Sequence, residues 1–349
     1  MSATTGIGTY LTELVPRVAA LMDDVHFTVM GASDALADRV RSVPRVSIVA
    51  FDQPIYGFVE QVELLRLIPR DTTLYWSPHY NIPLLFRGAL AVTVHDAFPV
   101  ARPQLSAIRT LYARSMFAAV RRRAALVLCD SQFTASEFRR IVGEPRTLAV
   151  VHLGVAPEWF RVRAESSPLA VPYFLYVGNL KTHKNVARLL AAFGRIADRV
   201  PHSLVLIGPR DGLRSSDPQI PRLLDGLGDR VHDAGQLPLS SLQRFVAACD
   251  ALVLPSLYEG FGLPPLEAMA CGRAVAVGRT ASLPEVCGPY AEYFDPFQVS
   301  DIAAALERLA LRPPDREEDR ATRRAWARTF DWDACADRTA SALRACLDR

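Results

Sequence analysis

Short, β-branched apolar runs alternate with segments of helical periodicity along almost the whole chain. This alternation is typical of βαβ units and parallel sheets, and it restricts the chain to the α/β class. The 349 residues exceed what one ordinary hydrophobic core holds, so we expect two lobes. Half of the residues are hydrophobic and 22% are charged, which excludes a disordered chain.

The predicted strands fall into two series separated by the proline-containing segment Arg163–Pro172. We therefore predict an N-terminal domain over 1–165, a second domain over 166–325 and a C-terminal helix over 326–349 that packs back on a lobe through Trp326, Phe330 and Trp332. The predicted strands are Val25–Met30, Arg45–Ala50, Thr72–Trp76, Ala89–Val94, Ala125–Cys129, Thr147–His152, Tyr173–Val177, Leu204–Gly208, Arg230–Asp233, Ala251–Pro255, Ala274–Val277 and Glu292–Phe294; the predicted helices include Tyr10–Met22, Asn185–Arg199, Leu239–Cys249, Pro265–Cys271 and Ser300–Leu311.

Charge and cysteine usage narrow the class of protein. A net charge of +3 is far below the basic footprint of a dedicated nucleic-acid binder, so no nucleic-acid partner is expected. The six cysteines form neither a CxxC pair nor a dense disulfide framework, which indicates a reducing cytosol. No apolar run approaches the roughly 18–20 residues of a membrane span.

The most specific motif is a glycine-containing turn between a predicted strand and a predicted helix. Gly260 and Gly262 let the backbone approach a ligand closely, and N–H groups at the helix start can face an anion such as a diphosphate. Glu259 precedes the turn and Glu267 lies about one turn inside the helix, so one carboxylate can face a sugar and the other can face hydroxyls further along the ligand. The alternative is a structural turn whose glutamate favours the helix dipole.

Only two of the 40 basic residues are lysines, Lys181 and Lys184. Their closeness suggests a site that needs a compact ammonium group, and coincidence in an arginine-rich composition is the alternative. Two stacked α/β lobes would put a cleft between the carboxyl ends of their sheets, where we expect the active site.

The turn resembles the E-x7-E signature of the GT-B retaining glycosyltransferases of family 4. The resemblance extends over nearly the whole chain and points to bacterial mannosyltransferase-like enzymes of surface-polysaccharide assembly. It implies a GT-B fold, in which two Rossmann-like domains with parallel sheets face each other across a cleft and a C-terminal helix packs back. Further similar motifs are Gly6-Ile-Gly8-Thr-Tyr10, Thr93-Val-His95-Asp96, Tyr176-Val-Gly-Asn-Leu-Lys181-Thr-His-Lys184-Asn185, Ala270-Cys-Gly272-Arg-Ala-Val and Leu283-Pro-Glu285-Val.

The resemblance also implies roles for single residues. Lys184 matches the phosphate-binding lysine, Glu267 the glutamate that receives the ribose hydroxyls, and Glu259 the glutamate near the transferred sugar. Asn179 stands where relatives have an arginine, so a second positive charge is either missing or supplied by Lys181 or another group. The candidate catalytic residues are His95, Lys184 and Glu259, and the donor-binding candidates are Gly8, Asn179, Lys181, Lys184, Gly260, Phe261, Gly262, Leu263 and Glu267.

In the first lobe, His95 matches a histidine that positions the donor sugar, and a satisfied structural histidine is the alternative. His79 is a candidate acceptor contact. Relatives begin with a strand ahead of the loop at Gly6. This chain has only five residues there, which predicts either a truncated start or a first sheet that lacks a strand and has exposed edges.

Two other segments invite a functional interpretation. Asp331-Trp-Asp333 imitates a metal-binding Asp-x-Asp motif, but we expect Asp333 to be the N-cap of the last helix and the protein to need neither metal nor cofactor. Arg109–Arg123 combines apolar residues with five arginines. This segment could rest on anionic lipid, or it could pack on the first sheet with its arginines solvated.

The sequence thus predicts a cytoplasmic, metal-independent, retaining glycosyltransferase that moves a hexose from a nucleotide diphosphate sugar to a hydroxyl acceptor. GDP-mannose is the first predicted donor, followed by UDP-hexoses. The predicted acceptor is a lipid-linked glycan of envelope polysaccharide assembly, with peripheral contact at the inner face of the membrane. The alternatives are a non-catalytic nucleotide-sugar-binding protein of the same fold, a natural-product glycosyltransferase and a sugar-nucleotide epimerase. A phosphorylase would need a cofactor lysine far from Lys181 and Lys184, and the chain has none.

Overall fold

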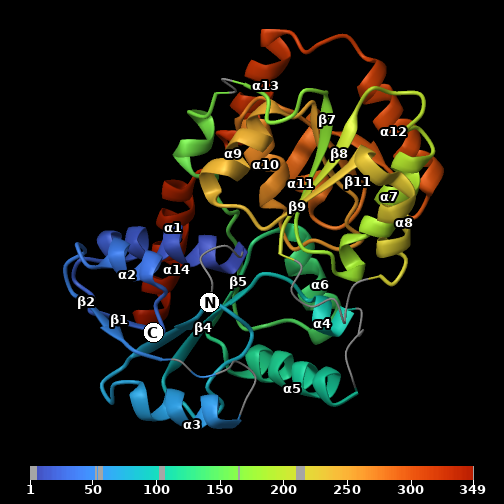
Figure 1. The fold of residues 1–349 in the computed structure, drawn as a ribbon. Coiled ribbons are helices and arrows are strands. Elements are labelled where there is room, and N and C mark those ends of the chain that lie inside the picture. Colours follow the sequence, from blue (N-terminus) through green and yellow to red (C-terminus); the bar gives the residue numbers. More distant parts are fainter. Residues whose placement is uncertain are drawn as a thin grey trace. The chain divides into compact units, whose positions relative to one another are not determined.

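The computed structural model describes residues 6–51, 53, 58–101, 107–163, 166–209 and 217–348. The chain divides into two compact units. Unit 1 consists of Met1–Gly154 and Phe330–Arg349, and unit 2 consists of Val155–Thr329. Both units are built on parallel strands, so the predicted α/β class is confirmed (Figure 1).

Unit 1 carries two separate parallel sheets. One pairs β1 with β2, and the other has the order β3-β4-β5-β6. Helices α5 and α6 pack on β4 and β5 over a core of fully buried apolar side chains. The elements of unit 1 are α1 (Gly6–Leu21), β1 (Phe27–Met30), α2 (Asp34–Val40), β2 (Val46–Val49), α3 (Phe58–Leu67), β3 (Leu74–Ser77), β4 (Ala89–Val94), α4 (Phe98–Ala101), α5 (Ala107–Arg123), β5 (Leu126–Cys129), α6 (Gln132–Val142), β6 (Leu148–Val150) and α14 (Trp332–Leu347).

The two sheets of unit 1 share a small core without being paired to each other through the described strands. Val29 of β1 and Trp76 of β3 both pack on a cluster formed by Val15, Leu36 and Val40. The predicted lack of a first strand concerns the chain ahead of Gly6, and residues 1–5 lie outside the described part. The predicted loop at Gly6–Gly8 is wrong, because helix α1 already begins at Gly6.

Unit 2 has one six-stranded parallel sheet in the order β12-β11-β10-β7-β8-β9. Helices α7, α8 and α12 form one group beside this sheet, and α9, α10 and α13 form another (Figure 1). The elements of unit 2 are η1 (Pro157–Phe160), β7 (Tyr173–Val177), η2 (Thr182–Lys184), α7 (Val186–Gly194), β8 (Ser203–Ile207), α8 (Ile220–Leu227), η4 (Gly228–Arg230), β9 (Val231–Gly235), α9 (Leu239–Ala248), β10 (Ala251–Leu254), α10 (Leu263–Ala270), β11 (Ala274–Gly278), α11 (Leu283–Cys287), η5 (Gly288–Tyr290), β12 (Glu292–Phe294), α12 (Val299–Leu311) and α13 (Glu317–Ala327).

The chain passes from one unit to the other at residues that differ from the predicted domain boundaries. The first division falls at Gly154/Val155 and not at 165/166, because η1 packs on α10: Trp159 is buried and its carbonyl oxygen lies 3.4 Å from Cys271 Sγ. The second division falls at Thr329/Phe330 and not at 325/326, because Trp326 belongs to unit 2. Its indole Nε1 donates to the carbonyl oxygen of Val286.

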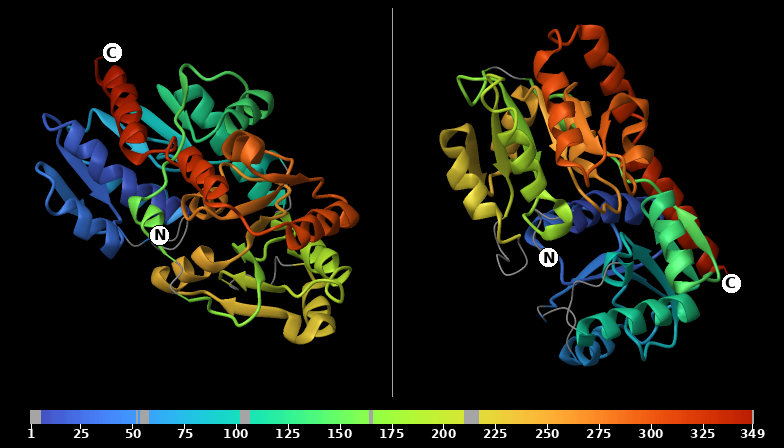
Figure 2. Two further views of the ribbon diagram at one scale, coloured as in Figure 1. Left: turned by 90° about the horizontal axis from the view of Figure 1, so that it is seen from above. Right: turned by 90° about the vertical axis from the view of Figure 1, so that its right-hand side faces the viewer.

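The C-terminal helix α14 returns to unit 1 and lies beside α1 (Figures 1 and 2). Trp332 is fully buried at its start, where a side chain added at Gly154 would collide with the Trp332 backbone. The predicted N-cap is wrong by two residues. Asp331 caps the helix by accepting from the backbone N–H of Asp333, whereas the Asp333 carboxylate pairs with Arg17 at 2.7 Å.

Candidate functional site

In unit 2, the strand pairing brings two loops together. Strands β7 and β10 are neighbours, so the segments that follow them emerge at the same edge of the sheet. The backbone N–H of Leu257, after β10, donates to the carbonyl oxygen of His183, after β7, over 2.8 Å. The two loops that carry the candidate lysines and the glycine turn are therefore joined directly.

A buried asparagine fixes the first of these loops. Asn185 adopts a left-handed backbone conformation (φ 63°) between η2 and α7. Its side-chain amide donates to the carbonyl oxygens of Pro255 at 3.0 Å and Pro296 at 2.7 Å. Because these bonds tie η2 to the segments that follow β10 and β12, the neighbouring Lys184 has a defined position.

Lys184 and Glu259 form an ion pair at the centre of this arrangement. The ammonium Nζ lies 2.6 Å from Glu259 Oε1, and 18% and 12% of the two side chains are exposed. Ser256 donates to the same carboxylate oxygen at 2.7 Å, and Ser282 donates to the carbonyl oxygens of Glu259 and Phe261. The pair is therefore held rigidly at a site that solvent still reaches. Neither serine had been singled out from the sequence.

The turn that follows leads into α10 through a glycine. Gly262 has φ 105°, a left-handed value that favours glycine, and an added side chain there would come within 2.9 Å of Leu283. In the described part of the chain, no backbone carbonyl oxygen accepts from the N–H groups of Gly262 and Leu263. The next two positions are prolines and have no N–H, so the donors for an anion are concentrated in the turn itself.

Glu267 lies one turn inside α10 and is partly buried. Burial, and secondarily the Glu158 carboxylate of η1, raise its pKa from 4.5 to about 7. A carboxyl group that is neutral below this pH can exchange its proton for hydrogen bonds from ligand hydroxyls. Glu158 had not been predicted as a neighbour, because η1 meets α10 only through the tertiary fold.

The segment after β7 has Asn179 at the position of the expected arginine. Asn179 does not point a charge into the site; its side-chain oxygen accepts from the backbone N–H of Lys181 at 3.3 Å, and its carbonyl oxygen accepts from Tyr176. Lys181 is exposed. Burial, then the ammonium groups of Lys184 and Lys181, lower the pKa of His183 to about 4, although Glu259 opposes them. Lys181 directly precedes the short helix η2, and Lys184 is its last residue.

Unit 1 places the two predicted histidines together. His95 follows β4, its ring meets the Tyr10 ring edge-on at 4.7 Å, and Tyr10 bonds to Thr93 at 2.9 Å. His95 Nδ1 lies 2.6 Å from a carboxylate that the sequence analysis missed, Asp130. Burial, and then the nearby His95, lower the pKa of His79 to about 4, so its ring is neutral at physiological pH. Gly8 is buried in α1.

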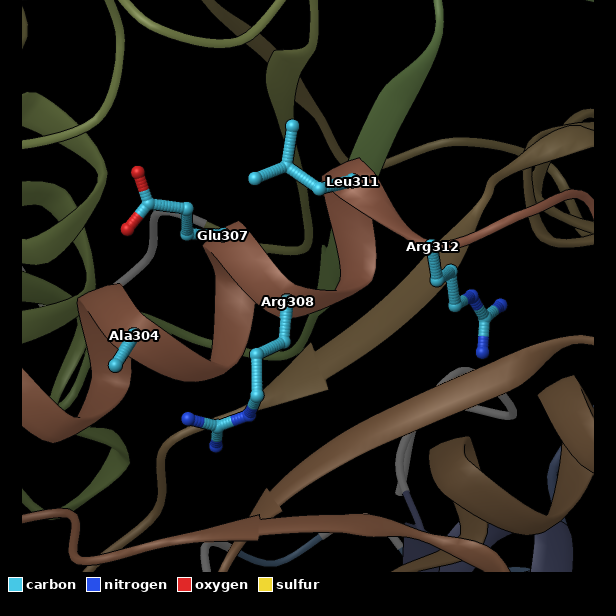
Figure 3. A pocket seen from close by; sticks show the side chains of 5 residues that line it. All are labelled: Ala304, Glu307, Arg308, Leu311 and Arg312. Carbon is cyan, nitrogen blue, oxygen red and sulfur yellow. The ribbon is translucent and has the colours of Figure 1, made fainter.

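Other features of the described chain lie outside this arrangement. The pocket in Figure 3 is lined by α12 and the residue after it, at Ala304, Glu307, Arg308, Leu311 and Arg312, and includes none of the predicted site residues. No group of three or more histidine, cysteine or acidic side chains that could hold a metal ion occurs in the described ranges. In the same ranges, no helix combines the length and the apolar character needed to cross a bilayer.

Comparison with known proteins identifies the family. The family model "Glycosyltransferase Family 4" matches residues 4–159, and the model "Glycosyl transferases group 1" matches residues 159–326. This chain belongs to the family 4 glycosyltransferases. It is 29% identical to O-antigen chain mannosyltransferase B of Escherichia coli, over 97% of this chain and 96% of that one. It is 27% identical to O-antigen chain mannosyltransferase RfbU of Salmonella typhimurium, over 69% and 65% of the two chains.

Solved structures show that this family 4 glycosyltransferase has the GT-B fold. Sucrose-phosphate synthase of Thermosynechococcus elongatus aligns with a TM-score of 0.78 at 20% identity, over 99% of this chain and 94% of that chain. Anabaena HepE in complex with UDP-glucose aligns with a TM-score of 0.72 at 19% identity, over 99% and 98%. The predicted fold and enzyme class are thus confirmed.

Proposed function

We propose that this glycosyltransferase moves mannose from GDP-mannose to a hydroxyl of a lipid-linked glycan in O-antigen-type polysaccharide assembly, with retention of the anomeric configuration. The named mannosyltransferase relatives support the sugar and the acceptor class. The observation that carries the proposal is the Lys184–Glu259 pair beside the glycine turn at the start of α10. This arrangement offers positive charge and backbone donors to a diphosphate.

In the proposed reaction, unit 2 binds the donor and stabilises the leaving diphosphate. The ammonium of Lys184 and the N–H groups of Gly262 and Leu263 meet negative charge that grows as the bond to the sugar breaks. The acceptor proton passes to the leaving phosphate oxygen on the same face of the sugar, so the protein supplies orientation and charge and no covalent nucleophile. His95 positions the sugar.

Glu259 and Glu267 have different tasks in this proposal. Glu259 accepts from Lys184 and Ser256 and keeps the ammonium in place until the diphosphate arrives. Glu267, with a pKa of about 7, receives the ribose hydroxyls of the donor. Since Asn179 is committed to the backbone of its own loop, we assign the second phosphate charge to the exposed Lys181. The reaction as proposed needs neither metal nor cofactor.

The experiment compares donors by thermal shift and then by transfer. A donor at a hundred times its dissociation constant stabilises a protein by ~2.7 kcal/mol. We expect GDP-mannose to raise the melting temperature more than UDP-glucose or UDP-galactose, and to give a mannosylated product with the anomeric configuration of the donor. A stronger shift with a UDP-hexose would contradict the donor assignment, and an inverted product would contradict retention. Binding without transfer or hydrolysis would favour a non-catalytic protein.

We further propose that helix α5 rests on anionic lipid at the cytoplasmic face of a membrane. Ile108 and Leu111 are 81% and 67% exposed, and exposed arginines lie on the same helix. Arg123 holds the loop that bears the exposed Leu85 by donating to the Leu84 and Phe86 carbonyl oxygens. Apolar side chains among cationic ones suit an anionic interface.

Vesicle sedimentation tests this surface. The change Ile108→Ser should weaken binding to vesicles containing phosphatidylglycerol, whereas Leu239→Ser, an equivalent change at an exposed leucine of unit 2, should not. Equal binding of both variants, or equal binding to neutral phosphatidylcholine vesicles, would contradict the assignment.

A further inference from the structure

The pairing of His95 with Asp130 follows from the register of two strands. β4 and β5 are parallel neighbours in which Val94 lies opposite Cys129. His95 and Asp130 are the next residues on each strand, so their side chains emerge side by side at the carboxyl edge of the sheet. Nδ1 and Oδ2 lie 2.6 Å apart, and the two side chains are 14% and 4% exposed.

The backbone around the pair is fixed on both sides. Ser131 caps α6 by accepting from the backbone N–H of Thr134 at 3.0 Å, and the Thr134 hydroxyl donates to the carbonyl oxygen of His95 at 3.2 Å. The Tyr10 ring bounds the imidazole on another side. The short turn into α6 therefore fixes Asp130 and His95 relative to each other, and the imidazole has little freedom to rotate.

The chemistry of the pair assigns the ring nitrogens. An ionised carboxylate only accepts hydrogen bonds, so Nδ1 carries a proton and donates it to Asp130. Nε2 is then the only ring nitrogen that can meet a ligand. A separation of 2.6 Å is short even for a charge-assisted bond, and such a bond is strongest when the imidazole is an imidazolium.

We propose that Asp130 is a positioning residue for His95: its carboxylate fixes the imidazole, keeps it positively charged, and so makes Nε2–H a hydrogen-bond donor to an oxygen of the sugar substrate. This inference rests on the proposed function, in which His95 positions the sugar. It adds the residue that sets the charge and direction of the ring. Asp130 touches no substrate in this scheme and acts only through His95.

The groups around the ring favour this charge state. Burial lowers the pKa of His95, but Asp130 raises it by charge and hydrogen bonding, Asp96 and the Pro78 carbonyl add to this, and the net shift is upward. The phenol of Tyr10 and the thiol of Cys335 on α14 are neutral, since burial and Asp130 raise the pKa of each. His79 stays neutral. The nearby cations are Arg139, beside the Cys129 thiol, and Arg17 and Arg338, beside the Cys335 thiol.

A second histidine–aspartate pair serves as a matched control. In unit 2, His202 Nε2 lies 3.1 Å from Asp250 Oδ2, where Asp250 is 46% exposed and the His202 ring stacks on Phe174. This pair lies apart from the proposed donor residues. Asp250→Asn therefore reports what the loss of a histidine–aspartate contact does to the protein in general.

The experiment measures the titration of His95 and the pH profile of transfer in Asp130→Asn, Asp130→Glu and Asp250→Asn. The seven histidines are followed by side-chain nitrogen NMR, with His95→Gln used for assignment. We expect Asp130→Asn to lower the titration midpoint of His95 and to move the alkaline limb of kcat to lower pH by the same amount. We also expect it to reduce kcat above neutral pH by about 10- to 100-fold. Asp130→Glu should restore part of both effects, and Asp250→Asn should cause neither.

Two results would overturn the proposal. One is an unchanged His95 titration in Asp130→Asn; the other is a shifted titration with a pH profile of transfer that stays in place. The titration is read on the free enzyme, so it remains informative if no donor is transferred. Failure of the proposed sugar transfer and failure of the positioning role are therefore distinguishable.

Discussion

Replacing Lys184 with alanine tests the charge on which the proposed donor site depends. The ammonium has a carboxylate neighbour at 2.6 Å and keeps 18% of its side chain exposed, so a diphosphate can approach it from solvent. A preorganised group that stabilises developing charge typically contributes ~3–4 kcal/mol to lowering the barrier. We therefore expect kcat to fall by roughly 100- to 1000-fold.

The change should also lower stability. It leaves the Glu259 carboxylate, 12% exposed, without its ammonium partner, although Ser256 still donates to it. Removing one partner of a largely buried pair costs up to about 3–5 kcal/mol of unfolding free energy, and the remaining solvent contact reduces this cost. The fall in kcat is therefore measured well below the melting temperature of the variant, where the variant is folded.

The assay measures steady-state transfer and thermal unfolding on the same preparations. Arg199→Ala is the control, because it removes a cation from another ion pair of unit 2, with Glu307 at 2.9 Å, outside the proposed site. It should leave kcat within twofold to threefold of the parent. If Lys184→Ala also stays within threefold, the ammonium does not stabilise the leaving group and the reasoning fails.

Three further outcomes are expected. The pKa of Glu267 is raised from 4.5 to about 7, so the folded state binds more protons than the unfolded state between these pH values. The unfolding free energy should therefore decrease as pH rises from about 4.5 to about 7. Glu267→Gln should abolish this dependence in urea titrations. Gly154→Ala should lower the unfolding free energy by about 1–3 kcal/mol, because the added methyl group collides with the Trp332 backbone; an unchanged urea midpoint would contradict this. Treatment with EDTA should leave transfer unchanged, and activity that disappears and returns with manganese would refute metal independence.

Much of the fold could be predicted because the strands and the longer helices follow from the local periodicity of apolar residues. Each predicted strand has a counterpart among the described strands, within one or two residues at most ends. Runs such as Ala251–Leu254 are buried on both faces, which makes them continuously apolar and easy to find. The helices missed, such as α2 and α8, are short, with seven and eight residues.

The parts that failed depend on contacts between distant segments. The first domain boundary was placed in the proline-containing segment, but burial of Trp159 against α10 decides which unit that stretch joins. The N-cap was placed at Asp333, and both Asp331 and Asp333 have the side chain for it; the partner Arg17 on α1 decides between them. Neither contact can be inferred from the local sequence.

Some residues of the candidate site could likewise be predicted from motifs, whereas others are brought together only by the tertiary fold. Lys184, Glu259 and the glycine turn were found by motif because they lie in two short stretches, and the structure joins these within unit 2. Asp130 was missed, since only the β4–β5 register sets it opposite His95. A sequence reader who aligned the first residue after each predicted parallel strand would have had the signal needed to find it.

Because α14 returns to unit 1, unit 1 is formed from two separate stretches of the chain and unit 2 lies between them in the sequence. Unit 2 is a single uninterrupted stretch, whereas unit 1 is completed only by the last twenty residues, from Phe330 to Arg349. A recombinant fragment cut after Thr329 would therefore lose Trp332 and the surface that covers α1, even though it retains every strand of the first unit. Residues 155–329 can instead be excised as one continuous piece, so unit 2 is the one suited to expression alone.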